Sequence, residues 1–196
     1  MSVSAVSICS NALLMNGAQT ISSFSDNTER ARQCANLYPT VRDYVLSSHP
    51  WNCCIKRVQL SPDSTSPAYD WVNQFTLPAD FLRILAVGEA GGEDDYDIED
   101  GKILTDAALL NLRYIYRNDN EVKWTGLLVM AVTLAMRSVL AFPITQSTSL
   151  EQLITTSIKP ILQQARAIDA QDQPPETLGD FHLQTSRFTP RSGGSN

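Results

Sequence analysis

The sequence predicts an α+β fold that is mostly α: a four-helix bundle of two N-terminal and two C-terminal helices, an inserted antiparallel β-sheet, and an extended C-terminal tail. Three observations predict it. The most apolar run, 122–142, carries charge only at Lys123 and Arg137 and has apolar residues on almost every helical side. Apolar residues recur at helical spacing on both sides of the segment 52–116, which itself alternates with period two. From residue 172 onward the chain is polar and without period.

Composition restricts the class of protein. The 196 residues are enough for one domain with a real core, and 43% hydrophobic content is ordinary for a globular protein. The formal net charge of -6 argues against a nucleic-acid binder held by phosphate contacts. The uncharged part of 122–142 stops at Arg137, short of the run of about 20 residues that a membrane span needs, so we expect no membrane segment.

The N-terminal residues and the cysteines are typical of a protein in a reducing cytoplasm. The first residues have no basic n-region, so no signal peptide is predicted. The four cysteines include no CxxC pair, and we expect free thiols in a reducing cytoplasm. They are Cys9, Cys34, Cys53 and Cys54.

The first helix pair is expected at 3–47. The helix 3–16 ends at Gly17, a natural stop. Asp26 with Glu29 has capping-box spacing and opens a second helix, which runs to about Ser47. Pro39 lies inside this helix and is expected to kink it.

The inserted sheet is expected at 52–116. Its predicted strands are 52–60, 69–77, 81–87 and 110–116, with a short hairpin between the third and fourth. Asp100-Gly101 is the favoured two-residue turn of that hairpin.

The second helix pair is expected at 121–170. Pro143 should close the long helix because proline cannot continue one. A fourth helix follows at 149–170, with a second kink at Pro160. Residues 1–171 would thus form a single domain, and 172–196 an extended tail.

The search for catalytic chemistry finds little. His49 and His182 are the only histidines, and neither has the setting of a catalytic triad. His49 stands before Pro50 at a helix exit, which predicts a surface or capping residue. There is no P-loop and no HExxH motif. We therefore expect no enzyme activity, no cofactor and no catalytic, cofactor-binding or metal residues.

An acidic cluster leaves three interpretations open. It comprises Glu89, Glu93, Asp94, Asp95, Asp97, Glu99 and Asp100. It can be a solvated loop. It can mimic a calcium loop that starts at Asp95 and ends at Asp106, although its glycine falls one position late. It can also form a negative pore wall to which DNA does not stick.

Trp51 and a group of apolar residues in the tail each have two possible roles. Trp51 is expected in the core at the corner between helix and sheet, rather than on a ligand. Phe181, Leu183 and Phe188 are spaced through the polar tail. They are either solvated or dock on a partner as the tail becomes ordered.

The order of motifs resembles the tail tubular protein A family, the head-to-tail adaptors of short-tailed phages. The similarity lies in the opening ICSNALLMNG, the run FSDNTERARQCANLYPTVRDYVLSSHPWNCCIKRVQL, the strand WVNQFTLPADFLRIL, and YDIEDGKILTDAALLNLRYIY leading into AFPIT. It covers most of residues 5–170, and its specificity comes from the series rather than from any single piece.

The resemblance implies a structural virion protein of the tail or neck, synthesised in the bacterial host cytoplasm. Such subunits assemble as a ring, typically of twelve copies, under the portal protein, and offer a platform to the next tail or nozzle protein. DNA would pass through the ring channel without sequence-specific binding.

The resemblance also suggests roles for particular residues. Candidate ring or bundle contacts are Arg137 and Arg166. The acidic loop of Glu93, Asp94, Asp95 and Asp97 would face the lumen or the tail. The candidate portal-docking residues of the tail are Phe181, Leu183, Arg187, Phe188 and Arg191.

Two other hypotheses remain. One is another neck or tail-completion protein with a different neighbour. The other is a small metal-assisted hydrolase that uses the acidic loop 93–100.

Overall fold

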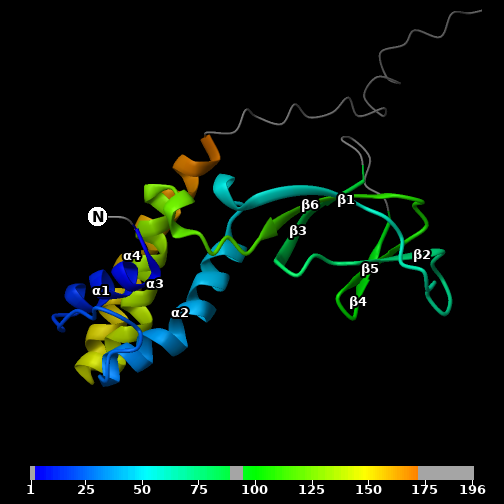
Figure 1. Ribbon diagram of the computed structural model, residues 1–196. Helices are drawn as coiled ribbons and strands as arrows, with labels where there is room; N and C mark the ends of the chain where they lie inside the picture. Colours follow the sequence, from blue (N-terminus) through cyan, green and yellow to red (C-terminus); the bar gives the residue numbers. More distant parts are fainter. Residues whose placement is uncertain (1–2, 89–94, 172–196) are drawn as a thin grey trace, which may run out of the picture.

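The computed structural model describes residues 3–88 and 95–171. Its helices gather at one end of the molecule and its strands form an arm at the other, as Figure 1 shows. About 50% of the described residues are helical and 19% lie in strands. The helices are α1 (Ala5–Met15), α2 (Glu29–Ser48), α3 (Gly126–Thr145) and α4 (Thr148–Gln171), with short 3₁₀ turns at Asn52–Cys54 and Glu121–Lys123. The strands are β1 (Ile55–Leu60), β2 (Asn73–Thr76), β3 (Phe81–Val87), β4 (Asp97–Glu99), β5 (Lys102–Thr105) and β6 (Leu110–Tyr116).

The predicted fold, a mostly-α four-helix bundle with one inserted sheet, is wrong. Residues 3–88 and 95–171 form an α+β structure, with four helices and two small three-stranded antiparallel sheets. The helices are arranged around α3, and α1, α2 and α4 each pack on it. This follows from the composition of α3, because a helix that is apolar around most of its circumference buries each side against a different neighbour.

The helix α3 is the centre of the helical end. Leu128, Val132, Met136 and Leu140 are fully buried in the main core with residues of α1 and α2. By length and composition α3 is also apolar enough to cross a membrane, a test that buried core helices pass as well. The contacts of these four side chains identify it as a core helix within this structure.

The ends of α3 differ from those predicted at 122 and 142. The helix begins at Gly126, where Thr125 Oγ1 accepts a hydrogen bond from Leu128 N at 3.3 Å. It continues through Pro143, so the prediction that Pro143 closes it is wrong. Proline removes one hydrogen bond here, but the last turn is still closed by Gln146 N, which donates to Phe142 O at 2.8 Å.

The second helix, α2, confirms the predicted span, with Pro39 inside it. Its N-cap is Thr28, whose hydroxyl accepts from Ala31 N at 3.2 Å. The predicted box of Asp26 with Glu29 is wrong, because Asp26 Oδ2 instead accepts from Ser22 N and Ser23 N in the preceding loop.

The strands form two sheets instead of one. The first sheet has the order β1-β6-β3, and the second has the order β2-β5-β4. The β4–β5 hairpin turns at Asp100 and Gly101, both with positive φ, as predicted for this dipeptide. Two strands are shorter than predicted: residues 52–54 form a 3₁₀ turn, and 69–72 form bends before β2. A second core joins the sheets through Phe75, Val87, Ile103, Leu110, Leu112 and Tyr114.

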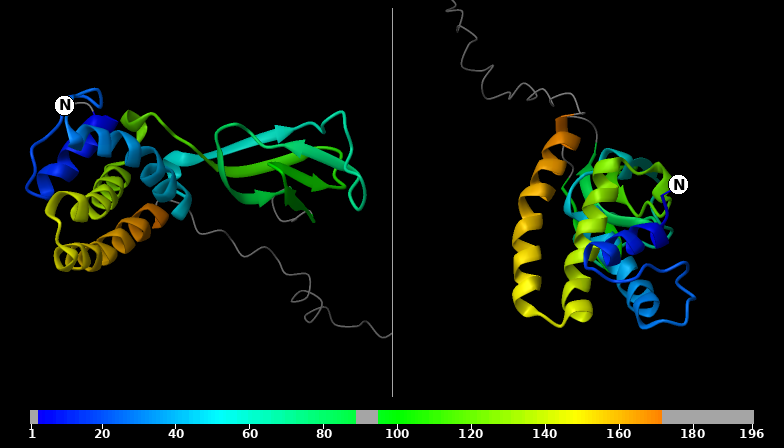
Figure 2. Two further views of the ribbon diagram at one scale, coloured as in Figure 1. Left: turned by 90° about the horizontal axis from the view of Figure 1, so that it is seen from below. Right: turned by 90° about the vertical axis from the view of Figure 1, so that its left-hand side faces the viewer.

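The last helix, α4, runs back alongside α3, as the right-hand view of Figure 2 shows. Leu134 and Ala141 of α3 pack with Ile154 and Ile158 of α4 in a small third core. The C-terminal end of α4 thereby reaches the junction between the helical end and the arm.

Candidate functional site

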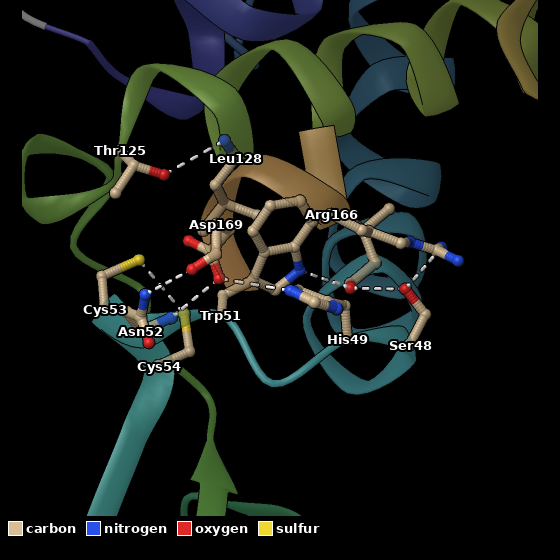
Figure 3. A network of polar contacts seen from close by, with 11 residues as sticks. Ser48, His49, Trp51, Asn52, Cys53, Cys54, Thr125, Leu128, Arg166 and Asp169 are labelled. Carbon is tan, nitrogen blue, oxygen red and sulfur yellow. Dashed lines mark hydrogen bonds and ion pairs between the residues drawn. The ribbon is translucent and has the colours of Figure 1, made fainter. Parts of the chain in front are cut away.

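A polar network lies where α2, β1 and the end of α4 meet (Figure 3). Its centre is Asp169 of α4, whose side chain is only 2% exposed. Asp169 Oδ2 lies 3.2 Å from His49 Nε2 and accepts a hydrogen bond from Asn52 N at 3.3 Å. Asn52 Nδ2 also donates to Asp169 O at 2.8 Å. The carboxylate thus forms hydrogen bonds with His49 at the start and with Asn52 at the end of the turn that leads from α2 into β1.

Local structure places these groups. His49 is the C-cap of α2, and its extended backbone turns the chain away from the helix before Pro50. Trp51 is 1% exposed, as predicted for a core residue, and its Nε1 donates to Val45 O at 3.1 Å. His49 stands edge-on to this indole, with ring centroids 4.7 Å apart. Packing against Trp51 therefore fixes the imidazole beside Asp169.

A second link joins α4 to α2 one turn earlier. Arg166 Nη2 donates to Ser48 Oγ at 3.0 Å. Ser48 Oγ in turn donates to Val45 O at 2.8 Å. Two residues of α4 thus bind the last turn of α2 and the chain just after it.

The electrostatics of the network favour a neutral His49. Burial lowers the pKa of His49 below its usual value, and the nearby Arg166 and Arg83 act in the same direction. The hydrogen bond to Asp169 opposes this shift but does not cancel it. In the tautomer that carries its proton on Nε2, the neutral imidazole donates to the Asp169 carboxylate, which can only accept.

Two adjacent thiols lie beside the network. Cys53 Sγ and Cys54 Sγ are 3.7 Å apart, and both cysteines are reduced. The hydrogen bond from the Cys54 thiol lowers the pKa of Cys53 to about 7, aided by the backbone N–H of Thr125. The same contact and complete burial raise the pKa of Cys54. A thiolate therefore forms at the half-buried Cys53 rather than at Cys54.

The arrangement lacks the geometry of a catalytic triad. His49 Nε2 is bonded to Asp169, and Ser48 Oγ is bonded to Val45 O and Arg166. No hydroxyl or thiol group of the described residues forms a hydrogen bond with the His49 ring, so His49 has no nucleophile to activate. The network is built to hold the end of α4 in place, immediately before the segment 172–196 begins.

Arg137, a predicted ring or bundle contact, lies on α3 and is partly buried. Its Nε is buried and has no hydrogen-bond partner in the described part of the chain. Its carbonyl oxygen accepts from Asn16 Nδ2 at 3.0 Å. An acidic partner within the bundle is not found among residues 3–88 and 95–171, and a partner on another subunit stays a prediction.

Arg166, the second such residue, contacts Ser48 in the same chain. Its Nε is likewise buried, without a hydrogen-bond partner inside the described ranges. A role for Arg166 between subunits also stays a prediction.

The acidic loop falls partly outside the described residues, which include Asp95 and Asp97 but not Glu93 or Asp94. Asp97 lies in β4, and its Oδ2 accepts from Trp71 Nε1 at 3.0 Å. Asp106 Oδ1 accepts from Val72 N. No group of three His, Cys, Asp or Glu side chains able to hold a metal occurs among the described residues. The calcium-loop interpretation is wrong for its described part, because a strand and a turn separate the expected ligands.

The predicted portal-docking residues lie outside the described residues. They are Phe181, Leu183, Arg187, Phe188 and Arg191. Their roles stay predictions.

Sequence reasoning missed the centre of the network. In the sequence, Asp169 is one of several polar residues near the end of a predicted helix, and His49 is expected at the surface or as a cap. A signal existed, because Asp169 falls on the same helical face as the buried Ile158 and Ala165. A carboxylate on an apolar face requires a polar partner.

No protein-family model matches this sequence, and no curated protein matches it either.

Proposed function

We propose that this protein is a structural virion subunit, a head-to-tail adaptor that forms a ring under the portal protein. The ring, of about twelve copies as the resemblance implies, continues the DNA channel and forms the platform for the next tail protein. Its role is not enzymatic and does not involve a membrane. DNA passes through the channel without sequence-specific contacts.

One observation carries this proposal: α4 buries only one side of its apolar surface. Ile154, Ile158 and Ala165 face α3 and the core. A flank beside them stays exposed, and we call it the α4 flank; it consists of Leu150, Leu153, Ile161 and Ile168. Leu153 is 66% exposed. Several exposed large apolar side chains on one side of a helix are typical of a surface that packs against another chain.

The division of the molecule into two ends also supports the proposal. The helical end supplies the α4 flank for contacts between subunits, while the arm of two sheets projects away from it (Figure 1). A ring subunit needs both a body that packs laterally and an extension that meets the next component. The net charge of -6 suits a channel that DNA must leave easily.

The metal-assisted hydrolase gains no support from the described acids. Asp97 accepts a hydrogen bond from Trp71, and Asp106 accepts one from a backbone N–H. The described carboxylates do not converge on a common point that could hold a metal ion. A different neck or tail-completion protein differs from the adaptor only in its neighbour in the particle.

The experiment combines the protein with the portal protein of the same phage. We expect sedimentation velocity to show one large complex, and electron microscopy to show a ring of this protein on the portal. A chain truncated after residue 171 is expected to keep its fold and to lose portal binding.

Matched variants test the α4 flank. Leu153→Glu with Ile161→Glu should prevent ring formation and leave the helical content unchanged. Gln152→Glu with Gln163→Glu adds the same charge at exposed positions on another face of α4 and should assemble normally. Normal rings from the Leu153 and Ile161 variant would refute the flank as the subunit contact. A particle in which this protein does not contact the portal would refute the adaptor.

A further inference from the structure

The outer face of the second sheet carries a set of side chains that the proposed adaptor role does not use. In the antiparallel register, Gln74 of β2 lies beside Leu104 of β5, which lies beside Asp97 of β4. The next row on this face places Lys102 beside Glu99. The alternate residues Phe75 and Ile103 turn to the opposite face and are fully buried in the second core.

A concavity with a volume of about 260 Å³ lies on this outer face, between the sheet and the segment 67–71. Its lining residues are Pro67, Ala68, Tyr69, Asp70, Trp71, Gln74, Asp97, Glu99, Asp100, Lys102 and Leu104. Pockets for small-molecule ligands usually measure about 300–1,000 Å³. This concavity is smaller, and its size suits a single side chain.

Charge at the concavity is strongly negative. Asp70, Asp97, Glu99 and Asp100 face one cation, Lys102. Lys102 Nζ lies 3.2 Å from Asp63 Oδ2, so its charge is already balanced by a carboxylate outside the lining. Glu99 and Asp100 form no ion pair with any residue that the structure describes, and both are exposed. An electrostatic attraction for cations remains.

Two aromatic rings stand at the same place. Tyr69 is 78% exposed, whereas tyrosine side chains are usually at least partly buried. Trp71 is held in position because its Nε1 donates to Asp97 Oδ2 at 3.0 Å. Exposed rings beside carboxylates attract a cation through the ring face as well as through charge.

A buried amide gives an independent indication of a ligand. Gln74 is only 9% exposed, and it lines the concavity. Its side-chain amide has no hydrogen bond with any of the described residues, although its backbone oxygen accepts from Asp63 N. The amide atoms themselves keep some accessible area and open into the concavity. Polar side chains of residues buried this deeply usually have a partner, so an unpartnered amide that opens into a concavity points to a group that binds there.

We propose that this concavity binds an arginine side chain presented by a protein partner. A guanidinium is planar, so it stacks on an aromatic ring and forks onto a carboxylate at once. Tyr69 and Trp71 supply the rings, and Glu99 and Asp100 supply the carboxylates. Gln74 Oε1 accepts one of the remaining N–H groups. Nucleic acid is disfavoured by the same carboxylates. The proposal does not depend on the ring or on the portal.

The test titrates the full chain with N-acetyl-arginine amide and follows the three tryptophan indole N–H signals by NMR. We expect saturable shifts of the Trp71 signal. Trp51 and Trp124 are 1% and 7% exposed and serve as internal controls that should not move. N-acetyl-citrulline amide, which has the same shape without the charge, should cause no shift. An equal response to citrulline, or a stronger one to N-acetyl-lysine amide, would overturn the assignment.

A charge variant locates the site. Glu99→Gln with Asp100→Asn should raise the Kd for N-acetyl-arginine amide at least tenfold. Asparagine tolerates the left-handed conformation that Asp100 adopts at φ 46°, so the turn should persist. Asp119→Asn removes an exposed carboxylate between β6 and α3 and should leave the Kd unchanged.

A single variant, Glu99→Gln, guards against misfolding of the double variant and should weaken binding in the same direction. Raising the salt concentration should weaken binding to the unaltered protein as well. An unchanged Kd in both acidic variants would overturn the proposal.

Discussion

Asp169 Oδ2 lies 3.2 Å from His49 Nε2, a contact that joins residues 120 positions apart in the chain. It fastens the C-terminal end of α4 to the corner where α2 gives way to β1. The last turn of α4 is thereby fixed at this corner.

Removal of the Asp169 carboxylate should destabilise the protein. Asp169→Ala leaves His49 Nε2 and the backbone N–H of Asn52 without an acceptor in a buried place. Hydrogen bonds to charged groups contribute about 1.5–3 kcal/mol, so we expect the free energy of unfolding to fall by about 2 kcal/mol. Urea unfolding followed by circular dichroism measures this. The exposed Gln163→Ala in the same helix is the control, and an equal effect of both variants would contradict the role of Asp169.

Acidification should weaken the fold through His49. The pKa of His49 is lowered in the folded protein, whereas a histidine in an unfolded chain has a pKa of about 6.5. Below that pH the unfolded chain binds a proton that the folded chain does not, so the free energy of unfolding decreases as pH falls from 6.5 toward the folded-state pKa. Above 6.5 this contribution is complete.

The measurement for His49 is a series of urea unfolding curves between pH 7.5 and pH 5. His49→Gln keeps a side-chain donor for Asp169 and should lose the part of the pH dependence near 6.5. Identical pH profiles for the two proteins would show that His49 does not titrate as inferred.

Cys53 should be the reactive thiol. Its pKa is lowered to about 7 by the neighbouring Cys54 thiol, while Cys9, Cys34 and Cys54 are fully buried. At neutral pH we expect iodoacetamide to label the folded protein at Cys53 first, since the thiolate is the nucleophile. The rate should rise with a midpoint near pH 7, measured by mass spectrometry of the digested protein.

The control for Cys53 is Cys54→Ala, which removes the hydrogen bond to the thiolate and should shift the midpoint of the labelling rate upward. Preferential labelling of a buried cysteine in the folded state would contradict this order of reactivity.

Arg137→Met should stabilise the isolated protein. The Nε of Arg137 is buried without a partner in the described part of the chain, and an unsatisfied buried donor costs about 1–3 kcal/mol. Methionine fills a similar volume without that cost, so we expect the free energy of unfolding to rise by about 1 kcal/mol. If Arg137 pairs with an acid of a neighbouring subunit, the same variant should weaken the assembled ring.

The comparison for Arg137 is Arg166→Met, which removes the hydrogen bond to Ser48 and should destabilise the isolated protein. Destabilisation by Arg137→Met of similar size would mean that the guanidinium already has a partner within one chain.

Local patterns in the sequence predicted most of the elements but not their ends. The apolar run of α3, the hairpin at Asp100-Gly101 and the span of α2 were predicted because periodicity and turn chemistry act over a few residues. The end of α3 was missed at Pro143, since the last turn tolerates the loss of one hydrogen bond. The start of β2 was missed because Asp70 takes a positive φ, which breaks the period-two segment at 69–72.

The sequence by itself determined that α3 is buried, that a β segment separates two helical pairs, and that His49 ends α2. Tertiary structure alone decided that the strands form two sheets, that the helices gather around α3, and that Asp169 meets His49. The physical reason is the range of the interactions. Propensity and periodicity depend on neighbours in the chain, whereas a buried carboxylate is satisfied by whichever donor the packing brings to it, here one that lies 120 residues away.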